Sequence, residues 1–315
     1  MSERLVMMNQ RARPTFKWWV QDVVDAVLHY PSYLVERHIY ERPSARYRKM
    51  LIRVTGFDKL AADCEILSRD GVLILPGYFT GEPLQQMQQD YNRWCELKSG
   101  SDRYGFKDFD GGKQESYLAT SYSMSKVAVG PYLTALVSYY WGKPIRLAYC
   151  HGYRLDPIEP QEYRAFRWHH DLKRKQVRVM VLLTDTPVEG QRMDYIAGSH
   201  RVWHRFTNHR QCRFTEEEAR SYGSPIHCVG PAGTVVLFDA NGIHRGNRNL
   251  GSRRDQYTFN YTAGRALFPL PGLHPEVVKQ LTDRQRRMVR IDDDSRNLWT
   301  RFRHWITDRY FLRLW

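Results

Sequence analysis

Residues 233–247 read GTVVLFDANGIHRGN, an apolar run that ends at an aspartate and is followed by a turn and a histidine. The β-branched and aromatic residues of the run favour a short strand that ends near Asp239. Asn241 and Gly242 are typical turn residues, and His244 comes directly after them. The stretch therefore predicts a strand, a turn and a histidine placed at the start of the next segment.

Runs of the same kind recur along the central part of the chain. They are DGVLILPGYF (70–79), IRLAYCHGYRL (145–155), QVRVMVLLTD (176–185) and QYTFNYTAG (256–264). Glycine, proline, asparagine and aspartate separate them, and many short strands at close spacing indicate a β-sandwich or barrel, with jelly rolls among the options. One segment of this region, EPLQQMQQDYNRWCEL (82–97), instead has the pattern of a helix.

The regions on either side have helical rather than strand patterns, so the chain divides into three parts. Residues 1–62 are basic and mainly helical by pattern, as in FKWWVQDVVDAVLHY (16–30), whose apolar side chains share one helical face. Residues 63–265 carry the strands. Residues 266–315 return to helix and end in a segment, 298–315, where six aromatic residues alternate with four arginines. These amphipathic ends can pack on the β core, pack on a second subunit of a homo-oligomer, or lie in the interface of an anionic membrane.

Charge and cysteine content limit the setting in which the protein works. The 315 residues carry a net charge of +14, which favours anionic partners. The five cysteines are scattered and form no CxxC pair, so a reducing compartment is expected. No signal peptide is recognisable, and no apolar run approaches the roughly 20 residues of a membrane span. The sequence thus predicts a cytoplasmic protein, with peripheral membrane contact left open.

A second stretch, RWHHDL at 167–172, combines two histidines with an aspartate. Alternate side chains of an extended strand share a face, so His169 and Asp171 point one way and His170 points the other. Such a pair is weak evidence by itself, but His244 offers a third ligand. Two histidines and one carboxylate with open coordination positions form the facial triad that binds non-haem iron(II).

Ten residues after His244, Arg254 stands at the start of another predicted strand. A buried arginine near a metal would hold the distal carboxylate of a cosubstrate through charge-assisted, often bidentate hydrogen bonds. Arg253 alternates to the other face of the strand, which makes Arg254 the better candidate.

Several motifs resemble one known family over roughly residues 63–265. WHHDL, AGSHR, PAGTVVLFDANGIHRGNRN and RRDQYTFNY, preceded by DGVLILPGYF, are similar to the phytanoyl-CoA dioxygenase family of iron(II)/2-oxoglutarate-dependent oxygenases. The resemblance implies a mainly β protein with a double-stranded β-helix, or jelly-roll, core and helical additions at both ends. It also implies that His169, Asp171 and His244 bind iron(II) and that Arg254 binds the C5 carboxylate of 2-oxoglutarate.

Three details of the motifs refine this expectation. Related halogenases lack the carboxylate ligand, so Asp171 favours hydroxylation or another outcome of hydrogen abstraction. The family often has a small hydroxyl residue two places after the distal histidine, where this chain has Gly246. The resemblance also makes Ser199 and His200 of AGSHR a structural turn rather than catalytic residues.

The sequence therefore predicts an iron(II)/2-oxoglutarate-dependent dioxygenase that hydroxylates an unactivated C–H bond of an anionic small molecule, with a lipid-linked sugar as one option. Two other classes stay open: a nucleic-acid dealkylating oxygenase, although nucleic acid is the less favoured partner, and a non-enzymatic membrane-associated module on the same fold. Arg245, Arg248 and Arg253 can equally contact a substrate or be solvated loop charges. Tyr153 and Arg154 can reach the cavity, but core or surface positions are favoured for them.

Overall fold

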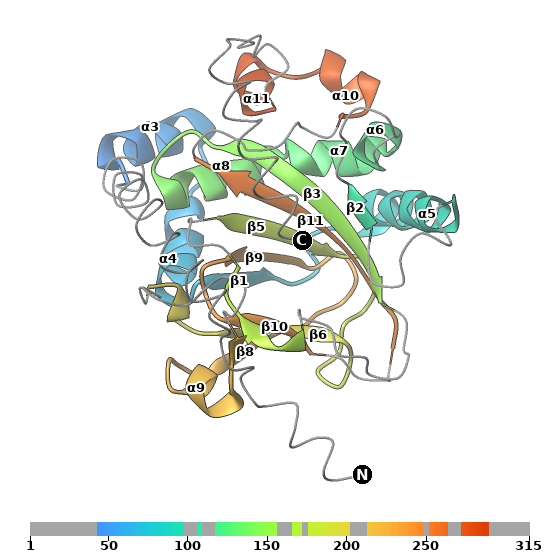
Figure 1. The fold of residues 1–315 in the computed structure, drawn as a ribbon. Coiled ribbons are helices and arrows are strands. Elements are labelled where there is room, and N and C mark those ends of the chain that lie inside the picture. The colour runs from blue at the N-terminus through green and yellow to red at the C-terminus, as the bar shows by residue number, and fades with distance from the viewer. Residues whose placement is uncertain are drawn as a thin grey trace, which may run out of the picture.

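The computed structural model of the chain describes residues 43–97, 106–108, 117–155, 166–171, 176–201, 213–247, 252–263 and 272–289. Two antiparallel sheets face each other at its centre, in the arrangement of a double-stranded β-helix (Figure 1). The mainly β, jelly-roll fold predicted from the short strands is therefore confirmed.

The larger sheet has six strands in the order β1-β9-β5-β11-β3-β2. Their bounds are Val72–Leu75 (β1), Val235–Asp239 (β9), Val177–Leu182 (β5), Arg254–Thr262 (β11), Arg146–Leu155 (β3) and Phe106–Asp108 (β2). The five runs named in the sequence each contain one of these strands, apart from β2, which no pattern indicated. Apolar side chains on alternate positions bury the outer face of this sheet under the helices, and on β1, β9 and β5 most inward positions are apolar as well.

The smaller sheet has five strands in the order β7-β4-β10-β6-β8. Their bounds are Arg213–Phe214 (β7), Trp168–His169 (β4), His244–Asn247 (β10), Arg192–Ile196 (β6) and Pro225–Cys228 (β8). Several of these strands are too short to show an alternating pattern in the sequence, so their pairing emerges only in the fold.

An apolar cluster joins the inner faces of the two sheets. Met180 and Phe238 of the larger sheet pack with Met193 and Tyr195 of the smaller one. Side chains alternate along a strand, so every second residue counted from these four also points into the space between the sheets. The space between the sheets is where the side chains of the predicted site must meet.

Helices cover the outer face of the larger sheet, opposite the smaller sheet (Figure 1). Those before β3 are α3 (Ala45–Thr55), α4 (Leu60–Asp70), α5 (Gly81–Leu97), α6 (Tyr117–Thr120), α7 (Tyr122–Ala128) and α8 (Pro131–Trp141). Later in the chain, α10 (Pro275–Lys279) and α11 (Asp283–Met288) join them, whereas α9 (Glu216–Arg220) lies beside β7 of the smaller sheet. Helix α5 confirms the helix predicted from EPLQQMQQDYNRWCEL.

Both predicted additions have described parts that pack on the core. Leu51 of α3 and Val277 of α10 are buried in the same cluster as the outer face of the larger sheet. The FKWWVQDVVDAVLHY helix and the aromatic segment 298–315 lie outside the described residues, so their structure and the boundaries at 62 and 265 stay predictions. Within the described part of the chain, no helix is long and apolar enough to cross a membrane.

Candidate metal centre

Three side chains that could bind a metal converge between the sheets. His169 ends β4 and His244 begins β10, and the two residues are direct partners in the antiparallel pairing of these strands. Asp171 follows β4 after one intervening residue. One ligand atom from each of the three lies within 4.8 Å of the others. The structure thus brings together the three residues that the sequence singled out.

Hydrogen bonds to the backbone orient both imidazoles. Nδ1 of His169 lies 2.7 Å from the carbonyl of Arg167, and Nδ1 of His244 lies 2.9 Å from the carbonyl of Gly242. A carbonyl only accepts, so each Nδ1 carries the proton and each Nε2 keeps its lone pair. Both Nε2 atoms lie 3.6 Å from a carboxylate oxygen of Asp171. Metal-binding histidines are commonly held in this way by a partner on the other ring nitrogen.

The carboxylate of Asp171 is fixed and ionised. Its backbone N–H donates to the carbonyl of Ala240, which ties the residue to the turn that precedes His244. Burial alone would raise the pKa of Asp171, but Arg178 above all, helped by the imidazoles of His244 and His169, holds this pKa well below its usual range. Arg178 on β5 makes the closest contact, with Nη2 2.5 Å from Oδ2. The site therefore offers a charged oxygen ligand at neutral pH.

Aromatic packing and a glycine restrict the position of His244. Its ring stacks on Tyr195 at 6.3 Å between centroids and contacts Phe238 at 5.3 Å. A Cβ atom added to Gly242 would lie 1.7 Å from the Tyr195 hydroxyl, so only glycine fits at this place in the turn. The hydroxyl of Tyr195 in turn donates to the carbonyl of Asp239. The predicted turn at residues 241–242 is thereby built around the ring that supports His244.

Arg254 lies on the same inner face as the metal cluster and is the candidate for binding the cosubstrate. Its side chain is buried, and Nε and Nη1 have no hydrogen-bond partner within the described ranges. Burial lowers the pKa of Arg254 to about 10, which still leaves the guanidinium charged at neutral pH. A buried cation with unpaired N–H groups is costly unless an anion completes it. Arg253, its neighbour, is exposed, as the alternation predicted.

His170 and Arg245, two further residues considered from the sequence, contact other side chains of the protein and not the metal cluster. His170 is buried and packs against Phe214, away from the cluster. Arg245 lies over the ring of Trp168, 4.2 Å from its centroid, and forms ion pairs with Asp194 and Glu216. These contacts occupy Arg245 on the outer face of the smaller sheet.

Arg154 also points outward, whereas Tyr153 faces the space between the sheets. Arg154 is paired with Asp255 at 2.7 Å. Tyr153 shares the inner side of β3 with His151, whose ring contacts its own. Arg248 lies outside the described residues.

The AGSHR segment forms a structural turn, as predicted. Ser199 is fully buried; its hydroxyl donates to the carbonyl of Ile196 and accepts from the N–H of Ile243. It thus connects the end of β6 to the turn before β10. The imidazole of His200 lies 3.1 Å from the carbonyl of Ser68, which links this turn to α4.

Replacing Ser199 with alanine should therefore destabilise the fold. It leaves a buried N–H and a buried carbonyl without the hydroxyl, which costs about 1–3 kcal/mol in the free energy of unfolding. Urea unfolding followed by circular dichroism measures the change. Ser221→Ala is the control, because its hydroxyl caps an exposed carbonyl at the end of α9 and surface changes stay within about 0.5 kcal/mol. Equal losses in the two variants would contradict the structural role of Ser199.

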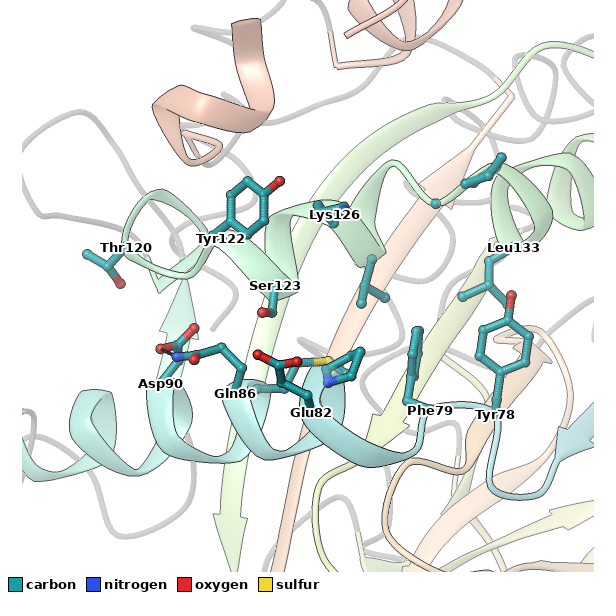
Figure 2. Close-up of a pocket in the computed structure, with 15 residues that line it drawn as sticks. Tyr78, Phe79, Glu82, Gln86, Asp90, Thr120, Tyr122, Ser123, Lys126 and Leu133 are labelled. Carbon is teal, nitrogen blue, oxygen red and sulfur yellow. Dashed lines mark hydrogen bonds between the residues drawn. The ribbon is translucent and has the colours of Figure 1, made fainter. Parts of the chain in front are cut away.

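A separate hollow of about 750 Å³ lies on the other side of the larger sheet. Figure 2 shows Glu82, Gln86 and Asp90 of α5 lining it opposite Tyr122 and Lys126 of α7. Its floor belongs to the apolar cluster beneath the helices, not to the cluster between the sheets. It contains none of the metal-cluster residues and lies outside the candidate metal centre.

The fold and this site together define a class, the double-stranded β-helix proteins with a facial triad of two histidines and one carboxylate. A model of the phytanoyl-CoA dioxygenase family, PhyH, matches residues 67–255. The match covers more than half of the chain, so the chain belongs to the phytanoyl-CoA dioxygenase family. It is accordingly an oxygenase that uses iron(II) and 2-oxoglutarate, as the sequence motifs predicted.

Solved structures support the fold assignment. SnoK, a non-heme alpha ketoglutarate dependent carbocyclase from nogalamycin biosynthesis, is 16% identical over 70% of this chain and 90% of its own, with a TM-score of 0.52. EctD from S. alaskensis is 20% identical over 64% of this chain and 76% of its own, with a TM-score of 0.52 for the apoform and 0.51 with bound Fe. Among curated protein sequences the chain has no significant match.

Proposed function

We propose that this oxygenase is a hydroxylase that oxidises an unactivated C–H bond of an anionic small molecule. The observation that carries the proposal is the convergence of His169, Asp171 and His244 on one point, with a buried, unpaired arginine on the same inner face. A carboxylate ligand completes the triad, which favours hydrogen abstraction followed by hydroxylation over transfer of a halide.

Each residue of the triad has a distinct task in this proposal. The Nε2 atoms of His169 and His244 and one carboxylate oxygen of Asp171 hold iron(II). The carbonyls behind both imidazoles keep the rings in the required tautomer and orientation. Arg178 contacts Oδ2 of Asp171 and so holds the carboxylate with each of its oxygens 3.6 Å from the Nε2 of one histidine.

Arg254 would bind the C5 carboxylate of 2-oxoglutarate. Its Nε and Nη1, which lack partners among the described residues, leave the guanidinium able to donate charge-assisted hydrogen bonds to this carboxylate. When bound, iron(II) and 2-oxoglutarate supply oxidation of the substrate by dioxygen, with conversion of 2-oxoglutarate to succinate and carbon dioxide. The inner walls of the two sheets exclude bulk water and fix the substrate carbon near the metal position.

The anionic character of the substrate is supported by the net charge of +14. A lipid-linked sugar is one form that such a substrate can take, and a soluble acidic metabolite is another. The aromatic, arginine-rich segment that motivates the lipid link, 298–315, lies outside the described residues. Membrane association therefore stays a prediction from the sequence.

The proposal is tested by assaying succinate with iron(II), 2-oxoglutarate and oxygen against organic acids, acyl-CoA esters and methylated oligonucleotides. We expect one acidic small molecule to raise succinate formation and to gain one oxygen atom by mass spectrometry. Chelation should abolish both signals, and added iron(II) should restore them. Stimulation by oligonucleotides alone would contradict the choice of substrate, and no succinate above the chelated control would contradict the enzymatic function.

A further inference from the structure

The inner face of the larger sheet is divided into an apolar half and a polar half. On β1, β9 and most of β5 the inward side chains are apolar and belong to the cluster that joins the sheets. On β3 and β11 they are polar: Tyr149, His151 and Tyr153 on β3, and Arg254, Gln256, Thr258 and Asn260 on β11. Buried polar groups normally have hydrogen-bond partners, so a polar inner wall is expected to bind a polar molecule.

Arg178 stands at the border of the two halves, beside the metal ligands. It is opposite Asn260 in the pairing of β5 with β11. Its Nη2 contacts Asp171 and donates to the hydroxyl of Tyr149 at 3.2 Å, whereas its buried Nε has no hydrogen-bond partner in the part of the chain that is described. The side chain is 15% exposed, although Nε itself is buried, and by strand alternation it points into the space between the sheets. Arg178 can therefore take a second anion without releasing Asp171.

Next to Arg178, the amide of Asn260 has a defined orientation. Its Nδ2 lies 3.3 Å from the carbonyl of Tyr149 and 3.3 Å from Nδ1 of His151. Because a carbonyl only accepts, this end of the amide must be the nitrogen. Oδ1 is then the atom without a partner among the described residues, and Asn260 is completely buried.

Thr258, two residues earlier on the same face, has a buried hydroxyl that likewise lacks a partner among the described residues. The oxygen of the Gln256 amide, two residues before Thr258 on β11, also lacks a hydrogen-bond partner among the described residues. Each buried acceptor left unpaired costs about 1–3 kcal/mol. These polar atoms share the inner face of β11, where Asn260 lies directly opposite Arg178.

The cosubstrate cannot supply partners for the two amide oxygens. At neutral pH 2-oxoglutarate has only acceptor oxygens, so it can pair with arginine but cannot donate to Oδ1 of Asn260 or Oε1 of Gln256. An alkyl chain would leave the same acceptors unpaired and the Nε of Arg178 desolvated. A molecule with an anionic group and several hydroxyl groups satisfies all of them.

We propose that Arg178, Asn260 and Thr258 form the substrate subsite, and that the substrate is a polyhydroxylated organic acid whose carboxylate binds Arg178 while its hydroxyls bind Asn260 and Thr258. This inference rests on the proposed function and specifies its substrate class. It places an acidic, sugar-like compound next to the metal ligands and excludes a fatty acyl chain from that position. Arg254 remains the residue for the cosubstrate, at the other end of the same wall.

The test is calorimetric titration of the zinc(II)-loaded full chain, which binds ligands without turnover. Wild-type protein is first saturated with 2-oxoglutarate and then titrated with D-glucuronate, a hydroxylated carboxylate, or with hexanoate, which has the same charge and no hydroxyl group. We expect glucuronate to bind more tightly than hexanoate. Arg178→Gln should weaken glucuronate binding at least about tenfold, since hydrogen bonds to charged groups contribute this much.

Two further variants separate the proposal from a general loss of structure. Arg154→Gln breaks an Arg–Asp ion pair with a similarly buried arginine on the opposite face of the same sheet, and should leave the glucuronate constant unchanged. Thr258→Val removes one unpaired hydroxyl without changing the shape of the side chain. It should weaken glucuronate but not hexanoate, and should raise the melting temperature of the ligand-free protein, which a purely structural hydroxyl would not do.

The outcomes are distinguishable. Wild-type protein that binds neither probe, or binds hexanoate as tightly as glucuronate, overturns the subsite. An Arg178→Gln variant that loses affinity for 2-oxoglutarate but not for glucuronate assigns Arg178 to the cosubstrate instead. Failure of zinc-loaded wild-type protein to bind 2-oxoglutarate at all would instead overturn the proposed function.

Discussion

His169→Ala is expected to abolish iron-dependent succinate formation, whereas His170→Ala should retain it. The two histidines are adjacent in the chain, yet His169 faces His244 across the strand pair and His170 packs against Phe214. Loss of a hydrogen bond that only supports a ligand costs 10–100-fold in metal affinity, so loss of the ligand itself should exceed about 100-fold. Equilibrium dialysis against iron(II) under anaerobic conditions measures the change.

The pair of variants also controls for stability, because both imidazoles are buried and both truncations leave a cavity. Circular dichroism should show that both variants fold. Retention of iron by His169→Ala together with its loss from His170→Ala would reverse the assignment of faces on β4. His170 would then take the place of His169 as a metal ligand.

Arg254→Gln should raise the apparent constant for 2-oxoglutarate by a factor on the order of 10²–10⁴, with iron binding kept. Removal of one partner from a buried charge pair costs about 3–5 kcal/mol, which corresponds to that range. The ligand-free protein, by contrast, should not lose stability, because in the described part of the chain Nε and Nη1 of Arg254 have no partner to lose. Calorimetric titration of 2-oxoglutarate into metal-loaded protein and thermal unfolding without ligands give the two numbers.

Arg253→Gln is the matched control, since it removes the same charge one residue away on an exposed side chain. It should leave the 2-oxoglutarate constant within a few-fold of the wild-type value, because exposed charges contribute little. If Arg253→Gln weakens the cosubstrate and Arg254→Gln does not, the alternation along β11 has been assigned to the wrong face.

Much of the fold and the central part of the site could be predicted from the sequence. Strand-forming runs bounded by turn residues are local signals, and alternation along a strand assigns each side chain to a face. That was sufficient to separate His169 from His170 and Arg254 from Arg253. The placement of His244 needed only the turn at Asn241 and Gly242, which is also a local feature.

Features that depend on contacts between distant segments could not be predicted in this way. Helix α8 is buried on most sides, so its sequence shows no amphipathic pattern, and none was recognised. The ion pair of Arg178 with Asp171 joins a strand to a segment that approaches it only in the folded chain. One signal existed, a single arginine within the otherwise apolar run VRVMVLL (177–183). Its even spacing from Met180 would have placed Arg178 inward.

The surroundings of Tyr153 and Arg154 illustrate the same limit. Both stand on a predicted strand and both were open as substrate contacts. Arg154 is in fact paired with Asp255, a partner on another strand that no local pattern reveals. The neutral option, Tyr153, is the one that faces the space between the sheets.

The central claim is that iron(II) and 2-oxoglutarate bind at the His169, Asp171 and His244 cluster with Arg254 as the anion anchor. A crystal structure with manganese(II) and 2-oxoglutarate tests it most directly, since anomalous scattering locates the metal. The account predicts one manganese ion held by Nε2 of both histidines and a carboxylate oxygen of Asp171, and a 2-oxoglutarate carboxylate on Arg254. Manganese held by other residues, or a cosubstrate carboxylate away from Arg254, would contradict it.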